Sequence, residues 1–247
     1  MKRILLVAIL LTNLFSARGQ YKKYNFQQPK MGSPFNIILY AEDSIRAAHA
    51  AQQAFQLVDT LNQVYSDYLP NSELNQLCST AGSGNWVTVS PVLYSILVSA
   101  KAAGNESKGS FDITLSPVIR IWRNARRLKM LPSKESIGLA MQKVGYQLID
   151  IDTLHKMVRL TKPGMQLDLG GIAKGETAQR VSNRLTALGF PFALIDACCS
   201  LCPARNCSIS FSSPVIRFCA ASYADTAAAS ASGYSLYSLL ANTPASA

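Results

Sequence analysis

The chain is organised around residues 166–176, which read Gln166-Leu167-Asp168-Leu169-Gly170-Gly171-Ile172-Ala173-Lys174-Gly175-Glu176. Their order predicts a short strand, a turn at the two glycines and the first turn of a helix. Apolar residues recur at roughly helical spacing as far as Gly189, which supports the helix. Because glycine has no Cβ atom, the backbone at Gly170 and Gly171 can take positive φ and lie close to a ligand.

A helix that starts after this turn would present free N–H groups and the positive end of its dipole, where phosphate oxygens bind. The dipole contributes only about 0.3–1 kcal/mol per exposed anion, so a tight phosphate site needs more positive charge. Lys174 and a metal ion held near Asp168 would supply that charge. An ordinary strand–turn–helix joint is the alternative interpretation, and Asp168 and Lys174 favour a binding site over it.

Length and composition indicate a globular chain of one or two domains. The 247 residues are enough for a sizeable core, and 49% of them are hydrophobic. The formal net charge of +10 suits an anionic ligand or partner. It is no indication of nucleic-acid binding, and we expect no nucleic-acid partner.

The N-terminus has the features of a secretory signal peptide over residues 1–19. Lys2 and Arg3 precede a mostly apolar run over residues 4–15, and Ala17-Arg18-Gly19 places small residues where a signal peptidase reads them. The run is shorter than the roughly 20 apolar residues of a comfortable membrane span, so an uncleaved anchor is the lesser alternative. We expect an exported protein of the periplasm or cell envelope, with no lipobox cysteine and no stable membrane span.

Helical and strand patterns alternate along the rest of the chain, which predicts a mixed α+β or α/β body. We expect strands over residues 35–40, 86–89, 148–152, 157–161 and 192–196, and helices over residues 44–65, 91–104, 133–144 and 172–188. Residues 65–75 indicate a loop, and residues 109–117 indicate an extended piece with the pattern of a half-buried strand. The arginine-rich segment 120–129 is typical of a solvated helix face, and it could also steer an anionic substrate or an acidic partner.

Four segments together resemble one protein family in order and spacing. They are Met31-Gly32-Ser33, the loop of residues 66–75, the run Gly109-Ser110-Phe111-Asp112-Ile113-Thr114-Leu115-Ser116-Pro117, and residues 167–175. The chain resembles the FAD:protein FMN transferases, known as the ApbE family, over roughly residues 25–197. This resemblance implies a flavin-transferase-like body with mixed sheets and flanking helices, whose C-terminal part is missing or replaced.

The resemblance implies an Mg²⁺-dependent enzyme that splits the pyrophosphate of FAD. Such an enzyme moves FMN onto a Thr or Ser hydroxyl of an acceptor protein and releases AMP. Matching positions imply that FAD is contacted by Met31, Tyr68, Ser110, Phe111, Asp112, Asp168 and Lys174. Gly171 would offer its carbonyl oxygen to the metal, and an aspartate near the metal is the natural candidate for the base.

The sequence departs from the family pattern after Ala197. The family continues there with a Gly-Gly-Asp strand end, whereas residues 198–247 are rich in Ser and Ala and hold five of the six cysteines. Cys199 and Cys202 have the spacing of a metal site, but disulfides are expected in an exported chain. We favour a reading-frame slip or a local rearrangement near codon 198. The alternatives to an active enzyme are a catalytically impaired FAD-binding remnant and a non-enzymatic exported binding module.

Overall fold

An antiparallel hairpin begins the part of the chain that the computed structural model describes, residues 21–197. Strand β1 (Lys22–Lys30) pairs with β2 (Ser33–Ala41), and β2 pairs on its other side with β6 (Ala193–Asp196). Alternate residues of β2 point inward, and Phe35, Ile37 and Leu39 are at most 1% exposed. This period of two gives the sheet one apolar face to cover.

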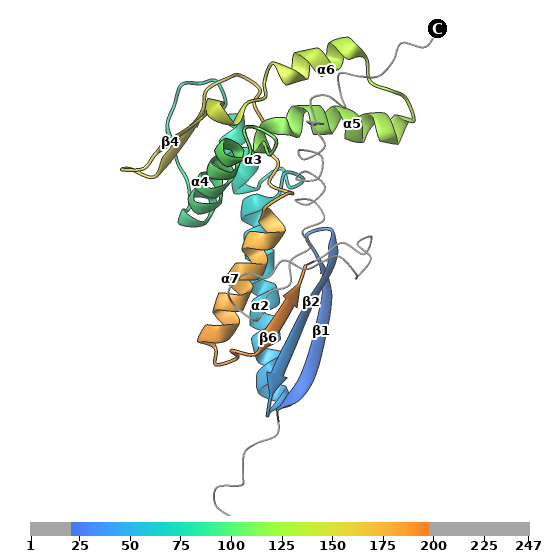
Figure 1. Cartoon of the computed structure of the whole chain (residues 1–247), viewed down its shortest axis with the longest axis vertical. Coiled ribbons are helices and arrows are strands. Elements are labelled where there is room, and N and C mark those ends of the chain that lie inside the picture. Colours follow the sequence, from blue (N-terminus) through green and yellow to red (C-terminus); the bar gives the residue numbers. More distant parts are fainter. Residues whose placement is uncertain (1–20, 198–247) are drawn as a thin grey trace, which may run out of the picture.

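Two helices cover that face, and the longer one continues into the other half of the molecule (Figure 1). Helix α2 (Ser44–Tyr65) packs on β1 and β2, while α7 (Ala173–Ala187) packs on β6 and on α2. The carboxylate of Asp43 caps α2, because its Oδ1 accepts a hydrogen bond from the Ile45 N–H at 2.8 Å. The apolar stripe expected for this helix is confirmed, since residues from Ala47 to Leu61 at helical spacing are buried.

A second core fills the other half, around short helices and a small sheet. Helices α3 (Glu73–Ser79) and α4 (Pro91–Glu106) pack there beside the antiparallel sheet β3–β5–β4, whose strands span Val87–Thr88, Met157–Leu160 and Ile149–Asp152. Two 3₁₀ turns, η1 (Ile113–Leu115) and η2 (Tyr146–Leu148), complete this half. Met31 and Leu57 touch both cores and join them.

Helices α5 (Ser116–Leu128) and α6 (Lys134–Met141) form a hairpin that projects from this second half (Figure 1). Lys129 ends α5 in the left-handed conformation with φ of 55°. Only Ser116 and Val118 of α5 are buried, so most of this helix lies on the surface.

The predicted mixed α+β class is confirmed, and most of the expected helices and strands are present. Helix α6 ends at Met141, earlier than the expected position near 144. The structure adds β1, which the sequence analysis did not predict, and α3, which begins inside the segment expected to be a loop. The Oγ of Ser72 accepts a hydrogen bond from the Asn75 N–H at 3.1 Å and so caps α3.

The strand expected over residues 109–117 is wrong. These residues form a turn, then η1, and then the start of α5. The reason is local, because Oδ1 of Asp112 accepts hydrogen bonds from both the N–H and the hydroxyl of Thr114, at 2.8 and 2.6 Å. An aspartate bonded to the backbone two residues ahead favours a turn over an extended ladder.

The short strand expected before the glycine pair is also absent. Leu167 and Leu169 are buried and alternate with half-buried neighbours, as the pattern predicted. The segments that hydrogen-bond to these residues are not strands, however, so no sheet ladder forms. The Asp168 N–H donates to the Ile113 carbonyl at 2.8 Å, and the Leu167 N–H donates to the Sγ of Cys78 at 3.3 Å.

Within residues 21–197, no helix combines the length and the apolar character that crossing a membrane requires. The predicted signal peptide of residues 1–19 and the divergent tail of residues 198–247 both lie outside the described residues. Those two assignments therefore stay predictions.

Candidate functional site

The glycine pair before α7 is explained by close packing. A Cβ atom at Gly170 would lie 2.9 Å from Oδ1 of Asp168, and one at Gly171 would lie 3.1 Å from Cε2 of Phe111. The two glycines do not use the positive φ that they allow, since neither is among the residues with positive φ. The turn therefore brings the Asp168 carboxylate and the Phe111 ring against bare backbone.

The carboxylate of Asp168 bonds to the backbone of this turn and to the guanidinium of Arg123. Its Oδ1 accepts a hydrogen bond from the Gly170 N–H at 2.7 Å, and its Oδ2 pairs with Nη2 of Arg123 at 2.8 Å. The side chain is only 10% exposed. Hydrogen bonds to a carboxylate are stronger in such a partly buried place than in water.

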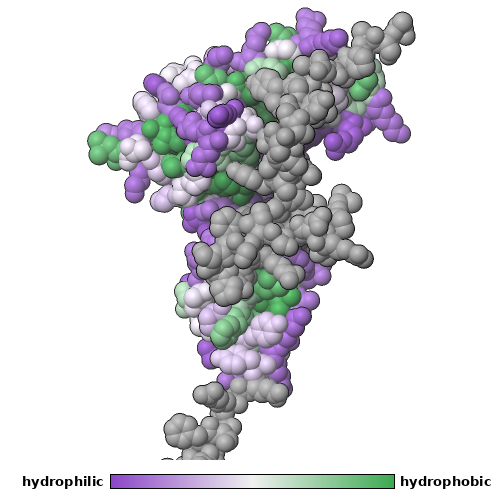
Figure 2. Space-filling view, viewed as in Figure 1, coloured by the Kyte–Doolittle hydropathy of each residue, from purple (hydrophilic) through white to green (hydrophobic). Residues whose placement is uncertain are grey.

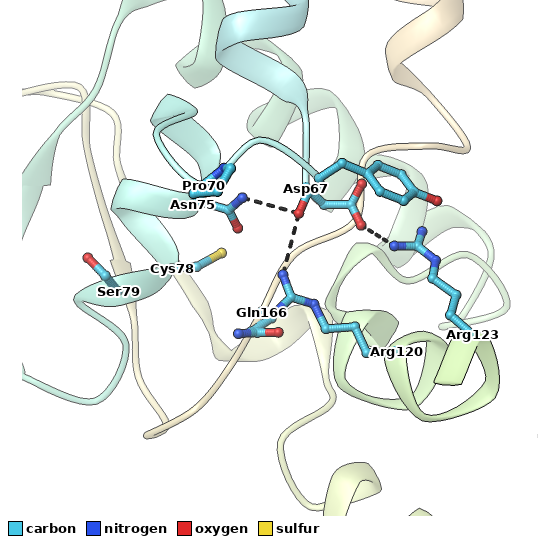
Figure 3. Close-up of a pocket in the computed structure, with 9 residues that line it drawn as sticks. Asp67, Pro70, Asn75, Cys78, Ser79, Arg120, Arg123 and Gln166 are labelled. Carbon is cyan, nitrogen blue, oxygen red and sulfur yellow. Dashed lines mark hydrogen bonds and ion pairs between the residues drawn. The ribbon is translucent and has the colours of Figure 1, made fainter. Parts of the chain in front are cut away.

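Arg123, on α5, links two carboxylates and one aromatic ring. Its second amino group pairs with Oδ2 of Asp67 (Figure 3). Its Cζ lies 4.4 Å from the centre of the Tyr68 ring. Burial alone would lower the pKa of Arg123, but the hydrogen bond and charge of Asp67 and the charge of Asp168 outweigh it and raise the pKa. The guanidinium is thus a fixed positive charge between the loop of Tyr68 and the glycine turn.

A cavity of about 550 Å³ opens beside this ion-pair network (Figure 3). Apolar and polar atoms both contribute to its wall, and two arginines are among the lining residues, which are Asp67, Tyr68, Pro70, Asn75, Cys78, Ser79, Arg120, Arg123 and Gln166. Asn75 on α3 donates to the carbonyls of Leu69 and Asp67, at 2.8 and 3.1 Å. The side-chain amide therefore fixes the loop that carries Tyr68, whose own ring is 72% exposed.

Cys78 closes one wall of the cavity and is a buried free thiol. Burial raises its pKa to about 11, against which the hydrogen bond from the Leu167 N–H acts only in part. The thiol is therefore protonated at neutral pH and is a poor nucleophile.

Lys174 connects the first turn of α7 to the turn between β1 and β2. Its Nζ donates to the Oγ of Ser33 at 3.0 Å. Met31 and Gly32 form that turn with φ of 50° and 76°, so the Met31-Gly32-Ser33 segment lies beside the start of α7. The N-cap residue Ile172 makes no side-chain cap, and the Ala173 N–H already donates to the Leu169 carbonyl at 2.7 Å. The N–H groups of Lys174 and Gly175, next in this first turn, are therefore the ones that could bind an anion.

The run that contains Ser110, Phe111 and Asp112 has a clear structural role. The Phe111 N–H donates to the Oγ of Ser107 at 3.0 Å, which places the ring against Gly171. The second oxygen of Asp112 accepts from the Tyr146 N–H at 3.0 Å. Both carboxylate oxygens of Asp112 are therefore engaged within the protein, and they tie η1 to η2.

The structure thus gathers most of the predicted site residues around the start of α7. Phe111 and Asp168 meet the glycine turn directly, Lys174 meets the Met31 segment, and Tyr68 is linked to Asp168 through Arg123. Sequence reasoning missed Arg123 and Asp67 as site residues. The arginine-rich segment was noticed, but helical spacing alone does not indicate which of its arginines faces a carboxylate.

A divalent cation would find few protein ligands here. The prediction assigns the Gly171 carbonyl to the metal and places the metal near Asp168, whose carboxylate already pairs with Arg123. Residues 21–197 contain no group of three or more His, Cys, Asp or Glu side chains placed to hold a metal. Mg²⁺ usually takes one or two protein oxygens and completes its shell with water and substrate phosphates. The donors therefore fit Mg²⁺ only together with a bound diphosphate.

Solved flavin transferases share this fold. The flavin transferase ApbE from Vibrio cholerae aligns with a TM-score of 0.65 and 21% identity, over 71% of this chain and 57% of that one. The flavinyl transferase ApbE of Pseudomonas stutzeri, in its apo form, aligns with a TM-score of 0.64 and 24% identity, over 72% of this chain and 59% of that one. These likenesses define the class as the flavin transferase fold.

The sequence assigns the chain to a family within that class. The profile of the ApbE family matches residues 31–204, so the chain belongs to the ApbE family. The FAD:protein FMN transferase of Klebsiella pneumoniae is 30% identical over 173 residues, 70% of this chain and 53% of that protein. The one from Treponema pallidum is 27% identical over 185 residues, 72% of this chain and 51% of that protein. The chain therefore spans about half the length of these curated relatives.

Proposed function

We propose that this protein is an FAD:protein FMN transferase, which transfers FMN from FAD to a Thr or Ser hydroxyl of an acceptor protein. Family membership supports the proposal. The observation that carries it is the convergence of Lys174, the uncapped start of α7 and the Asp168–Arg123 pair at one turn. That arrangement offers cations and N–H donors to a diphosphate beside an exposed aromatic ring, which is the chemistry of a dinucleotide with an aromatic base.

The charges of the site suit the transfer of a phosphoryl group. Such reactions depend mainly on positioning and on neutralising charge that spreads over the phosphate oxygens. Lys174 and the N–H groups at the start of α7 would hold the diphosphate from one side. Arg123 is held between Asp67 and Asp168, whose two negative charges exceed its own, so Lys174 and the metal ion would supply the net positive charge for the diphosphate.

In the proposed reaction, the hydroxyl oxygen of the acceptor forms a bond to the phosphorus of the FMN half. The bond from that phosphorus to the bridging oxygen breaks, and the bridging oxygen leaves with AMP. The hydroxyl proton passes to a base, for which a nearby aspartate is the natural candidate. The product is an acceptor protein esterified by FMN.

We propose that Mg²⁺ is required, with the Gly171 carbonyl and the Asp168 carboxylate among its ligands. When bound, the ion would neutralise the diphosphate charge that accumulates during transfer. The dependence is checked by adding EDTA to the transfer assay. We expect labelling to stop and to return with excess Mg²⁺.

We also propose that the protein acts outside the cytoplasm, after removal of a signal peptide over residues 1–19. Expression with and without these residues, followed by cell fractionation, tests this placement. Export that persists without residues 1–19 would contradict it.

The transfer itself is tested with FAD, Mg²⁺ and an acceptor protein that carries a flavinylation Thr or Ser. We expect fluorescent flavin on the acceptor that survives a denaturing gel. Asp168→Ala is expected to abolish it. The matched control is Asp150→Ala, because Asp150 pairs with Arg159 in the β4–β5 sheet, outside the residues of the proposed site.

Two results of this assay separate the parts of the proposal. Labelling that is unchanged in Asp168→Ala would mean that the site is assigned wrongly. Binding of FAD without any labelling would mean that the chain is a flavin-binding protein and not a transferase, which corresponds to the FAD-binding remnant considered above.

A further inference from the structure

The tip of the α5–α6 hairpin, residues 126–131, combines exposed apolar and basic side chains. Leu128, Met130 and Leu131 are 55%, 70% and 87% exposed. Arg126, Arg127 and Lys129 lie between or beside them and are exposed as well. Figure 2 shows hydrophobic surface next to strongly hydrophilic surface at this end of the molecule.

The charge of the tip has one sign only. Residues 116–133 contain no Asp or Glu. Among residues 21–197, no carboxylate forms an ion pair with Arg126, Arg127 or Lys129, since the ion pairs of this hairpin belong to Arg123. The tip therefore presents a concentrated positive charge that only an anionic partner would neutralise.

The positive charge of the tip argues against two partners that this chain could itself provide, its own tail and the tip of a second copy. The tail, residues 198–247, carries Arg205, Arg217 and only one acid, Asp225. Its basic residues outnumber its one acidic residue, so it offers no net negative charge to match the tip. A second copy of the chain, docked tip to tip, would bring two cationic surfaces together and would be repelled.

The shape of the tip favours a lipid surface over a protein groove. Its apolar residues lie at the projecting end of a helical hairpin (Figure 1), and none of them lines the cavity described above. The tip shares arginine and methionine with protein interfaces, but it lacks the aromatic residues that are typical of their centres and it carries a lysine, which they disfavour. Leucine and methionine flanked by Arg and Lys are typical of segments that enter the interface of an anionic bilayer.

We propose that the α5–α6 tip docks the protein onto anionic membrane surfaces, with Met130 and Leu131 entering the headgroup region and Arg126, Arg127 and Lys129 contacting lipid phosphates. The transfer site, centred on the glycine turn, is built from other residues. The docking therefore needs neither FAD nor an acceptor, and it succeeds or fails independently of the proposed function.

The test is sedimentation of the full chain with vesicles of phosphatidylcholine that contain about one third phosphatidylglycerol. We expect binding that weakens as salt rises, and weaker binding to vesicles of phosphatidylcholine alone. The double variant Arg126→Gln/Arg127→Gln should lower the affinity about fivefold for each arginine removed. Met130→Ser/Leu131→Ser should lower it as well.

Two matched controls distinguish the tip from general surface effects. Leu154→Ser removes a leucine that is 81% exposed in the β4–β5 turn, and Lys22→Gln/Lys23→Gln removes two exposed cations from β1. Both controls should bind vesicles like the unaltered protein. Because every variant keeps residues 1–20, any membrane affinity of that segment is the same in all of them.

Trypsin gives a local measurement at the tip itself. Anionic vesicles should slow cleavage after Arg126, Arg127 and Lys129, with no change for cleavage after Lys156 in the β4–β5 turn. Equal vesicle binding by the tip variants, or tip cleavage that vesicles leave unchanged, would overturn the proposal. A tip that instead binds an acidic protein, with no difference between the two vesicle types, would also overturn it.

Discussion

Gly170 and Gly171 leave space that neighbouring side chains occupy. The methyl group of an alanine at either position would come within 2.9 Å of Asp168 or 3.1 Å of Phe111. We therefore expect Gly170→Ala and Gly171→Ala each to lower the free energy of unfolding by about 1–3 kcal/mol, because a tightly packed turn must shift. Urea unfolding checks this value.

Gly138, inside α6, provides the matched control for these substitutions. A Cβ atom there meets nothing within 4 Å, and alanine is the better helix former. Gly138→Ala is expected to raise the free energy of unfolding by about 0.5–1 kcal/mol. Equal effects at all three glycines would contradict the packing explanation.

Arg123 is the residue that holds the two carboxylates of the site together. The side chains of Asp67 and Asp168 are only 8% and 10% exposed, so removing their shared cation leaves two charges in a poorly hydrated place. We expect Arg123→Ala to lower the free energy of unfolding by about 1–3 kcal/mol. Arg123→Lys should restore little, since an ammonium cannot reach both carboxylates as the planar guanidinium does.

Arg127→Ala serves as the control for that measurement. Arg127 lies on the same helix but contacts only the Asn124 amide at an exposed position. Its replacement should change stability by less than about 0.5 kcal/mol. A loss as large as that of Arg123→Ala would mean that helix propensity, and not the ion-pair network, determines the effect.

Cys78 predicts how stability depends on pH. Burial raises its pKa to about 11 from an ordinary value of 9.0, so the folded state holds the thiol proton more tightly than the unfolded state does. The resulting stabilisation is complete below about pH 9 and is lost as the pH rises toward 11, by roughly 2 kcal/mol. Tyr65, whose pKa burial raises to about 12, extends the loss to higher pH.

Urea midpoints between pH 7 and 11 measure this dependence. We expect a level region to pH 8.5 and a fall above it. Cys78→Ala should flatten the fall between pH 9 and 11, whatever its effect on stability at pH 7. An unchanged slope in that variant would show that the thiol is not the group responsible.

At the scale of elements, α3 determines the shape of the cavity. It carries Asn75, Cys78 and Ser79 on the cavity wall, and it is capped by Ser72, which is fully buried. Removing the capping hydroxyl should cost about 0.5–2 kcal/mol. We expect Ser72→Ala to lower the free energy of unfolding by this amount and to increase hydrogen exchange in α3 and in the Tyr68 loop.

The matched control is Ser133→Ala, which removes the equivalent cap from α6, whose residues are absent from the cavity lining. It should destabilise the hairpin without changing exchange at Asn75. Increased exchange around the cavity in both variants would mean that α3 is not held independently by its cap.

Long periodic elements could be predicted from the sequence, and short ones could not. Helix α2 spans twenty-two residues with an apolar stripe, and so long a repeat at helical spacing distinguishes a helix from a strand. The segment of Asp112 alternates polar and apolar residues over too few positions. There the aspartate–threonine hydrogen bonds, which no periodicity contains, determine a 3₁₀ turn instead of a strand.

At the scale of the whole molecule, the glycine turn could be recognised in the sequence because consecutive residues form it. The partners of that turn come from distant segments, Arg123 from α5 and Asp67 from the loop that follows α2. Their meeting depends on how α5, the loop after α2 and the glycine turn pack within the second half. A single sequence without its relatives contains no direct record of such contacts. The predicted roles of the site residues toward FAD remain predictions for this reason.

The central claim is that a diphosphate binds where the glycine pair meets α7. Calorimetric titration of the full chain with FAD in the presence of Mg²⁺ tests it most directly. We predict saturable binding that Lys174→Ala weakens about 10- to 100-fold, the value of one charge-assisted hydrogen bond, while Lys22→Ala on exposed β1 leaves it unchanged. An absence of FAD binding, or equal affinity in Lys174→Ala and the unaltered protein, would contradict the account.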